Sequence, residues 1–143
     1  MNDPRHELRQ EIWEHFADQQ HIFLATAEGG QPRVRPVTLI RLENRLLVAT
    51  GSKDAKVLQI ERNPKIEFCL LVEEGEKQGT IRAECIAKIV EDLKLKTTVF
   101  TKAPFMKEFF KTPSDPNYAL VELKPTKFEY MRPDSIEAIR VTL

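Results

Sequence analysis

Short apolar segments recur along most of this chain, and in several of them apolar and polar residues alternate. Such segments are typical of β-strands with a buried face. The pattern predicts strands over residues 21–27, 33–42, 46–50, 65–72, 80–90, 118–130 and 136–141. Because short turns join successive segments, we expect an antiparallel meander. With few helices beside it, this meander is expected to form a closed or nearly closed barrel, which removes unpaired strand edges.

Helical spacing is found in the remaining segments. Asp3 is placed to cap an opening helix, and Pro4 fits its first position. The inward stripe of this helix is expected to be Leu8, Ile12 and Phe16, with Trp13 beside it. Further helices are predicted over residues 57–62, 93–101 and 105–110, the last two separated by a break at Ala103 and Pro104.

The composition indicates a small globular chain. Its 143 residues, 41% of them hydrophobic, suit one domain over residues 1–143. The 22 Lys and Arg balance the 22 Asp and Glu, so no overall field attracts nucleic acid or an anionic membrane. No stretch approaches the roughly 20 apolar residues of a membrane span, and the start of the chain is charged, unlike a signal peptide. We expect a cytoplasmic protein.

Few side chains of this sequence are arranged for catalysis or metal binding. Cys69 and Cys85 lie far apart without a CxxC pattern, so we expect buried, reduced thiols and no metal. His6, His15 and His21 fit no HExxH pattern. No nucleophile elbow and no acid/base pair is found either, so no catalytic residue is expected.

The turn at residues 50–56, Thr-Gly-Ser-Lys-Asp-Ala-Lys, joins an apolar strand to a helix. Unpaired N–H groups and the positive end of the helix dipole, together with Lys53 and Lys56, would hold a phosphate there. The simpler alternative is that Ser52 or Asp54 only caps the helix and that the lysines are solvated. Arg35, on the preceding strand with Arg33, favours the anion site because side chains of adjacent strands converge.

The ordered residues from Arg35 onward resemble a known family. Arg35-Pro36-Val37-Thr38 is followed by a turn, a strand ending in Thr50, then Lys56, a helix and another apolar strand. This order resembles the pyridoxamine 5'-phosphate oxidase-like, FMN-binding split-barrel family, in particular its short, general stress protein-like members. The resemblance extends from about His21 to Pro133. It implies a mainly β fold with flanking helices, an antiparallel split β-barrel of the FMN-binding type.

The resemblance also implies a flavin site. In the family, the residues at the Arg35 and Lys56 positions bind the flavin phosphate, and the backbone at Val37 and Thr38 runs along the isoalloxazine ring. Many relatives carry serine where this chain has Asp54, whose carboxylate would repel a phosphate unless it turned away to cap the helix. Ser52 and Lys53 are then expected to supply contacts. The candidate cofactor-binding residues are Arg35, Pro36, Val37, Thr38, Thr50, Ser52, Lys53, Lys56, Gln78 and Arg82.

Members of the family are homodimers with the flavin in a groove between subunits, so a homodimer is implied here. Gln78 and Arg82 are the candidate contacts from the second subunit. The apolar residues of the segment 100–110 could either line such an interface or belong to the intramolecular core. These residues are Phe100, Phe105, Met106, Phe109 and Phe110.

The implied function is an FMN-binding flavoprotein, a small oxidoreductase whose cofactor carries out the redox chemistry. One alternative is a non-catalytic sensor or storage protein, and another is an enzyme that binds deazaflavin or haem. No lone histidine convincingly offers haem ligation.

We also expect no efficient pyridoxamine phosphate oxidase. The true oxidases carry lysine where this chain has Ile40, and the segment 100–110 lacks their substrate-phosphate pattern of Tyr, Arg and Ser. The residues up to Leu143 also lack their Trp- and Arg-bearing strand. Ile40 and the nearby phenylalanines favour either a less polar substrate or a flavin site that serves electron transfer.

Overall fold

The computed structural model describes residues 3–143. Strands and helices follow the predicted order, with some ends moved. The elements are α1 (Pro4–Glu14), β1 (Gln19–Glu28), β2 (Gln31–Leu42), β3 (Arg45–Gly51), α2 (Ala55–Arg62), β4 (Lys65–Glu74), β5 (Lys77–Val90), α3 (Leu93–Lys102), α4 (Met106–Phe109), β6 (Tyr118–Met131) and β7 (Ile139–Thr142).

The β5 strand starts earlier than predicted. Glu74 pairs with Lys77, so the charged segment after β4 continues the ladder and leaves only a two-residue turn. Gly75 has a φ of +63° in this turn, which glycine adopts readily. The last strand is shorter and later than the predicted segment 136–141, because residues 132–138 form no ladder.

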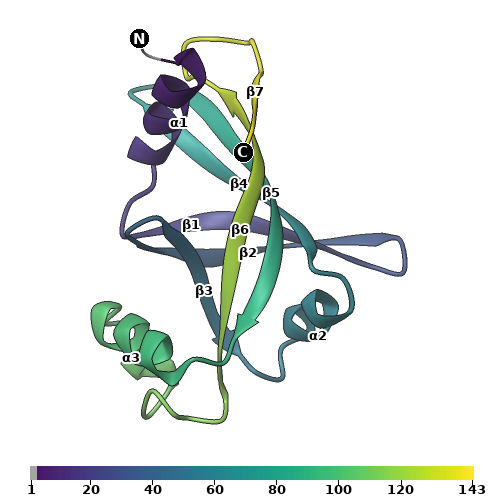
Figure 1. The fold of residues 1–143 in the computed structure, drawn as a ribbon, viewed down its shortest axis with the longest axis vertical. Helices are drawn as coiled ribbons and strands as arrows, with labels where there is room; N and C mark the ends of the chain where they lie inside the picture. Colours follow the sequence, from purple (N-terminus) through teal and green to yellow (C-terminus); the bar gives the residue numbers. More distant parts are fainter. Residues whose placement is uncertain (1–2) are drawn as a thin grey trace.

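The strands form a ring (Figure 1). All pairs are antiparallel, in the order β3-β2-β1-β4-β5-β6-β7, and an additional pairing of β3 with β6 closes the row. The predicted antiparallel, mainly β class is therefore confirmed. The expectation of one continuous meander is wrong, since β4 pairs with β1 and not with β3. Two meanders, β1–β3 and β4–β7, are instead joined through long-range pairs.

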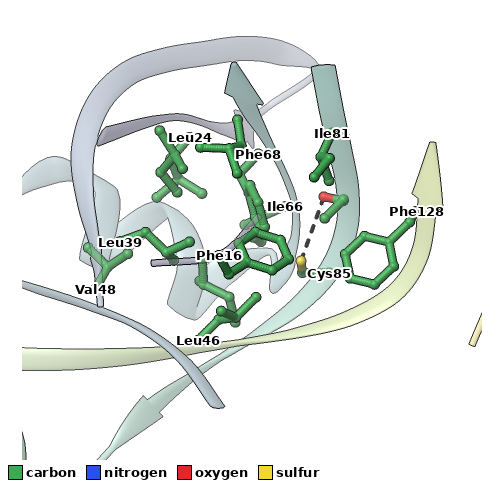
Figure 2. Close-up of a cluster of buried hydrophobic side chains, with 14 of the residues drawn as sticks. Phe16, Leu24, Leu39, Leu46, Val48, Ile66, Phe68, Ile81, Cys85 and Phe128 are labelled. Atoms are coloured by element: carbon green, nitrogen blue, oxygen red, sulfur yellow. Dashed lines mark hydrogen bonds between the residues drawn. The ribbon is translucent and has the colours of Figure 1, made fainter. Parts of the chain in front are cut away.

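The main core gathers buried apolar side chains of several strands around Phe16, which follows α1 in the chain (Figure 2). The expected stripe of α1 turns inward, with Ile12 and Phe16 fully or almost fully buried. The ring of Phe16 lies 6.0 Å from that of Phe68 and 6.2 Å from that of Phe128. Cys85 is buried in the same cluster. Burial of these aromatic and aliphatic side chains is the main stabilising term of this end of the molecule.

Polar contacts fix the α1 segment onto the ring. Arg41 of β2 donates to the carbonyls of Trp13 and Phe16, at 2.8 and 3.0 Å. Arg132 binds the Glu11 carboxylate with two hydrogen bonds of 2.8 and 3.0 Å. These contacts fix the last turn of α1 and the residues after it, so the Trp13 and Phe16 side chains reach the core.

A second, smaller core lies beneath α3 and α4. It gathers Ile40 and Leu47 from the strands with Phe100 of α3 and Met106 of α4, all buried. The segment 93–110, which contains α3 and α4, is called the helical arm below. Figure 1 shows α1 at one end of the molecule and α2 and α3 at the other. No helix within residues 3–143 is long and apolar enough to cross a membrane.

Candidate functional site

A cavity of about 370 Å³ lies between the strands and the helical arm at the α2 and α3 end of the molecule. One wall comes from the strands and from the first turn of α2, and the other is made of three phenylalanines. The lining residues are Val37, Thr38, Ala49, Thr50, Gly51, Lys56, Phe105, Phe109 and Phe110. Four of the predicted flavin contacts, Val37, Thr38, Thr50 and Lys56, therefore meet in one cavity.

Lys56 is the charged residue of this lining. It lies in the first turn of α2 and is only 7% exposed, which is rare for a lysine. Its Nζ donates to Thr50 Oγ1 at 2.7 Å and pairs with Asp54 Oδ2 at 3.0 Å. The positive end of the α2 dipole lies at the same place, so two sources of positive potential combine.

Asp54 caps the N-terminus of α2, which was one of the two caps expected from the sequence. Its Oδ1 accepts from the backbone N–H of Lys56 at 3.1 Å. Burial acts to raise the pKa of this carboxyl, but the hydrogen bonds and charge of Lys56 outweigh burial and lower it. The carboxylate thus caps the helix and also neutralises part of the Lys56 charge.

Arg35 lies on β2 beside the α2 terminus and is half-buried. Its Nη1 donates to Thr26 Oγ1 at 2.9 Å and to the Leu24 carbonyl at 3.3 Å, and its Nη2 donates to Gln59 Oε1 at 2.7 Å. Burial lowers the pKa of the guanidinium, and the nearby Asp54 carboxylate opposes this effect. Arg35 therefore lies beside α2, with hydrogen-bond partners on β1 and α2, but it makes no hydrogen bond to residues 50–56 and does not line the cavity.

The other residues of the turn point to different partners. The Ser52 hydroxyl donates to the Pro116 carbonyl at 2.9 Å, and its backbone N–H donates to the Asn117 carbonyl at 2.8 Å. Lys53 is exposed, and Pro36 is exposed on β2. Ser52 thereby connects the turn to the segment that precedes β6.

Gln78 and Arg82 lie on β5 and do not line this cavity. Arg82 forms ion pairs with Glu67 at 3.2 Å and with Glu129 at 2.9 Å. Their expected role as contacts from a second subunit stays a prediction.

The aromatic wall is held by a second buried group of side chains. Phe110 stacks on Tyr118 with ring centroids 5.0 Å apart, and Lys96 Nζ lies 4.6 Å from the centroid of the Tyr118 ring. Burial raises the pKa of Tyr118 to about 12, so its hydroxyl stays protonated and donates to the Lys96 carbonyl. Of the five apolar residues expected at an interface or in the core, Phe100 and Met106 belong to the core, and Phe109 is 69% exposed.

The cysteines and histidines do not form a second site. Both thiols are free, and Cys85 is buried as expected, whereas Cys69 is only half-buried. Burial raises the pKa of both thiols. His15 approaches the Tyr130 hydroxyl at 2.9 Å. Within residues 3–143 no three His, Cys, Asp or Glu side chains gather as metal ligands.

The sequence reading missed the polar partners of Arg35. Thr26 and Gln59 are buried to 3% and 7% exposure, and Gln59 also donates to Glu28 at 2.8 Å. The available signal was the position of Gln59, three residues after Lys56 and therefore on the same face of α2. The reading also missed the paired hydrogen bonds from Arg45 to Glu122, at 2.9 and 2.8 Å.

These features define a class of protein: a ring of antiparallel strands with a ligand-sized cavity between its outer wall, a helix N-terminus and a helical arm. The chain belongs to the pyridoxamine 5'-phosphate oxidase family, because the sequence model of that family matches residues 8–132. The family resemblance seen in the sequence is therefore confirmed. No curated protein matches the chain.

Solved structures agree with this assignment. General Stress Protein 26 from Bacillus anthracis str. Sterne is 27% identical with a TM-score of 0.74, and the match covers 94% of this chain and 99% of that chain. A nimc/nima family protein from Clostridium acetobutylicum is 21% identical with a TM-score of 0.75, covering 94% and 92%.

A heme binding protein from Mycobacterium smegmatis shares the fold at 12% identity and a TM-score of 0.77. That match covers 99% of this chain and 59% of the longer relative. The family thus has structural neighbours that bind haem as well as members known for flavin binding.

Proposed function

We propose that this protein binds FMN in the cavity beside α2 and serves as a small oxidoreductase. The phosphate would be held by Lys56, Thr50 and Arg35 at the N-terminus of α2, and the isoalloxazine ring would lie along Val37 and Thr38. The observation that carries the proposal is the buried Lys56 ammonium, placed at a helix N-terminus on the wall of an otherwise apolar and hydroxyl-bearing cavity.

The residues present fit a flavin phosphate. Lys56 offers a full charge, Thr50 a hydroxyl and α2 its dipole, which together form the usual chemistry of a phosphate site. Asp54 opposes an incoming phosphate, but the Lys56 hydrogen bonds and charge, which lower the Asp54 pKa against the effect of burial, favour a negative charge at this position. A phosphate would compete with that carboxylate for the same donors.

When bound, FMN supplies hydride or one-electron transfer, and the polypeptide contributes binding and orientation. The wall opposite Lys56 consists of Phe105, Phe109 and Phe110, and Ile40 is buried in the core beneath it. Such a surface favours a flat, weakly polar substrate. This supports the expectation that pyridoxamine phosphate is not the natural substrate.

We propose a homodimer, in line with a family whose members are commonly dimeric. The outer face of the ring carries neighbouring apolar side chains: Phe23 of β1 is 46% exposed, and Leu71 of β4 is 40% exposed. Phe23 lies opposite Pro36 on one side and opposite Cys69 on the other. An exposed group of this kind on a strand face is typical of an interaction surface. Gln78 and Arg82 would reach the flavin from the second subunit.

Haem binding is the second candidate, because a structural neighbour is a heme binding protein. Haem iron is normally held by His, Cys, Met or Tyr. None of the nine described residues that line the cavity is of these types, so the lining fits a flavin better. Non-catalytic flavin storage in the same cavity is the remaining alternative.

The identity of the ligand is tested by denaturing the purified protein and recording the spectrum of what is released. We expect the absorbance and fluorescence of FMN. A porphyrin spectrum, or a deazaflavin spectrum, would contradict the proposal. Turnover of reduced nicotinamide by the loaded protein would then distinguish an oxidoreductase from a storage protein.

A further inference from the structure

Arg35, Thr26 and Gln59 are joined pairwise by hydrogen bonds. Thr26 donates to Gln59 Oε1 at 2.6 Å, and both residues accept from the Arg35 guanidinium. Gln59 Oε1 therefore accepts two hydrogen bonds, while its Nε2 donates to Glu28 at 2.8 Å. These partners fix which end of the amide faces Arg35, because only the carbonyl oxygen accepts.

This group occupies one edge of the guanidinium and leaves another edge open. Both terminal nitrogens of Arg35 donate to the protein, whereas its Nε–H and the second Nη2–H have no hydrogen-bond partner within residues 3–143. The Nε and Nη2 pair is the edge with which Arg45 binds Glu122 and Arg132 binds Glu11 in this same protein. It is a fork that matches the oxygens of an anion.

Arg35 itself lies beside α2, the helix whose N-terminus holds the anion site, since Gln59 of that helix accepts from its Nη2. Asp54, the cap of α2, is close enough to influence the Arg35 pKa, and so is Arg33 from the same strand. Thr26 and Gln59 are both more than nine-tenths buried, so their positions are fixed by packing. A guanidinium held in this way loses little conformational freedom when it binds a ligand.

We propose that Thr26 and Gln59 are positioning residues that hold Arg35 by its Nη1 and Nη2 edge and leave its Nε and Nη2 edge for the flavin phosphate. This inference rests on the proposed FMN site. It makes Thr26 and Gln59 determinants of the preference for FMN over riboflavin, although neither residue touches the cofactor.

The test compares FMN and riboflavin titrations, followed by flavin fluorescence, for wild type and Gln59→Leu. Losing one charged hydrogen bond to Arg35 should weaken FMN binding about tenfold and leave riboflavin binding unchanged. Glu61→Gln, an exposed change on the same helix, is the control and should alter neither affinity. Equal losses for both flavins, or no loss for FMN, would overturn the inference and leave the proposed function standing.

A second pair of variants keeps the inference testable if Gln59→Leu does not fold. Thr26→Val removes the hydroxyl at nearly constant shape and should reduce the preference for FMN. Thr26→Ser keeps the hydroxyl and should retain that preference. Identical preferences in these two variants would contradict a positioning role. If wild type itself binds riboflavin as tightly as FMN, the proposed function fails, and this inference fails with it.

Discussion

The two ends of the strand ring are built in opposite ways. At the α1 end, apolar side chains such as Phe16 and Phe128 pack against one another in the main core, and the Arg132–Glu11 ion pair lies nearer the surface. At the α2 and α3 end, a lysine is buried beside a carboxylate, and phenylalanines border open space. The first arrangement stabilises the fold, whereas the second keeps charge and apolar surface available to a ligand, which is typical of functional sites.

The largest expected effect is a very low rate of pyridoxamine phosphate oxidation, because the cavity end offers no site for a second phosphate. Lys56 is the one charged residue among the described lining residues, so a second phosphate would find no clamp. Each missing charge-assisted hydrogen bond costs about 1.5–3 kcal/mol, and several are missing. FMN-loaded protein with pyridoxamine phosphate and oxygen should therefore form pyridoxal phosphate, followed by absorbance, far more slowly than about once per second.

Free FMN without protein is the control for that assay. Turnover near once per second, a typical low value for enzymes, would show that the cavity end is a two-phosphate site. Lys102 and Lys107 of the helical arm, which the sequence places near the cavity-lining phenylalanines, would then be the first residues to replace.

The same substitution at the two ends should separate stability from binding. Phe128→Ala opens a hole in the filled core and should lower the free energy of unfolding by about 3–5 kcal/mol. Phe109 is 69% exposed, so Phe109→Ala should change stability by less than about 0.5 kcal/mol. It should instead weaken flavin binding by a few-fold through lost aromatic contact. Urea unfolding and flavin titration of both variants measure this contrast, and equal losses of stability would remove it.

Binding at the cavity end should also stabilise the whole assembly. A ligand at one hundred times its Kd adds about 2.7 kcal/mol to the stability of the state that binds it. FMN should therefore raise the melting temperature and oppose dissociation of the dimer. Analytical ultracentrifugation with and without FMN checks this, and Leu71→Glu on the outer face should favour monomers. A flavin-loaded monomer at micromolar concentration would contradict both the dimer and the shared groove.

The smallest expected effect is the acid sensitivity of the α2 cap. Asp54→Ala should cost about 1 kcal/mol of stability, as for other helix caps. The folded pKa of Asp54 lies below its ordinary value of 3.8. The stabilisation is therefore complete above that value and is lost as pH falls through the folded pKa. The free energy of unfolding, measured against pH, should show this loss in wild type and lack it in Asp54→Ala. The same pH profile in both proteins would mean that the cap contributes nothing.

The contrast between the two ends also explains what the sequence predicted. Local pattern sufficed for the elements: Asp3 and Pro4 start α1, and the alternation along strands such as β5 marks their buried face. It did not predict that β4 pairs with β1, because pairing between distant strands depends on packing across the ring and leaves no local signal. The single expected meander was wrong for that reason.

At the candidate site, the sequence predicted four of the residues that line the cavity but missed the buried polar residues that contact Arg35. Thr50 and Lys56 meet Val37 and Thr38 in one cavity as expected, because the end of β3 and the start of α2 lie beside the middle of β2. Gln59 was missed because a polar residue on a helix face is usually solvated. Its burial depends on its hydrogen bond with Thr26, a residue of β1 that lies 33 positions earlier in the chain.

The most direct test of the central claim is the FMN affinity of wild type and Lys56→Ala, with Lys53→Ala as the matched control. Lys56 is buried at the cavity, whereas Lys53, three positions earlier in the same turn, is exposed. Removing a charged hydrogen-bond donor should weaken FMN binding about 10- to 100-fold in Lys56→Ala, with a smaller effect in Lys53→Ala. Equal FMN affinities of wild type and Lys56→Ala would show that the phosphate lies elsewhere.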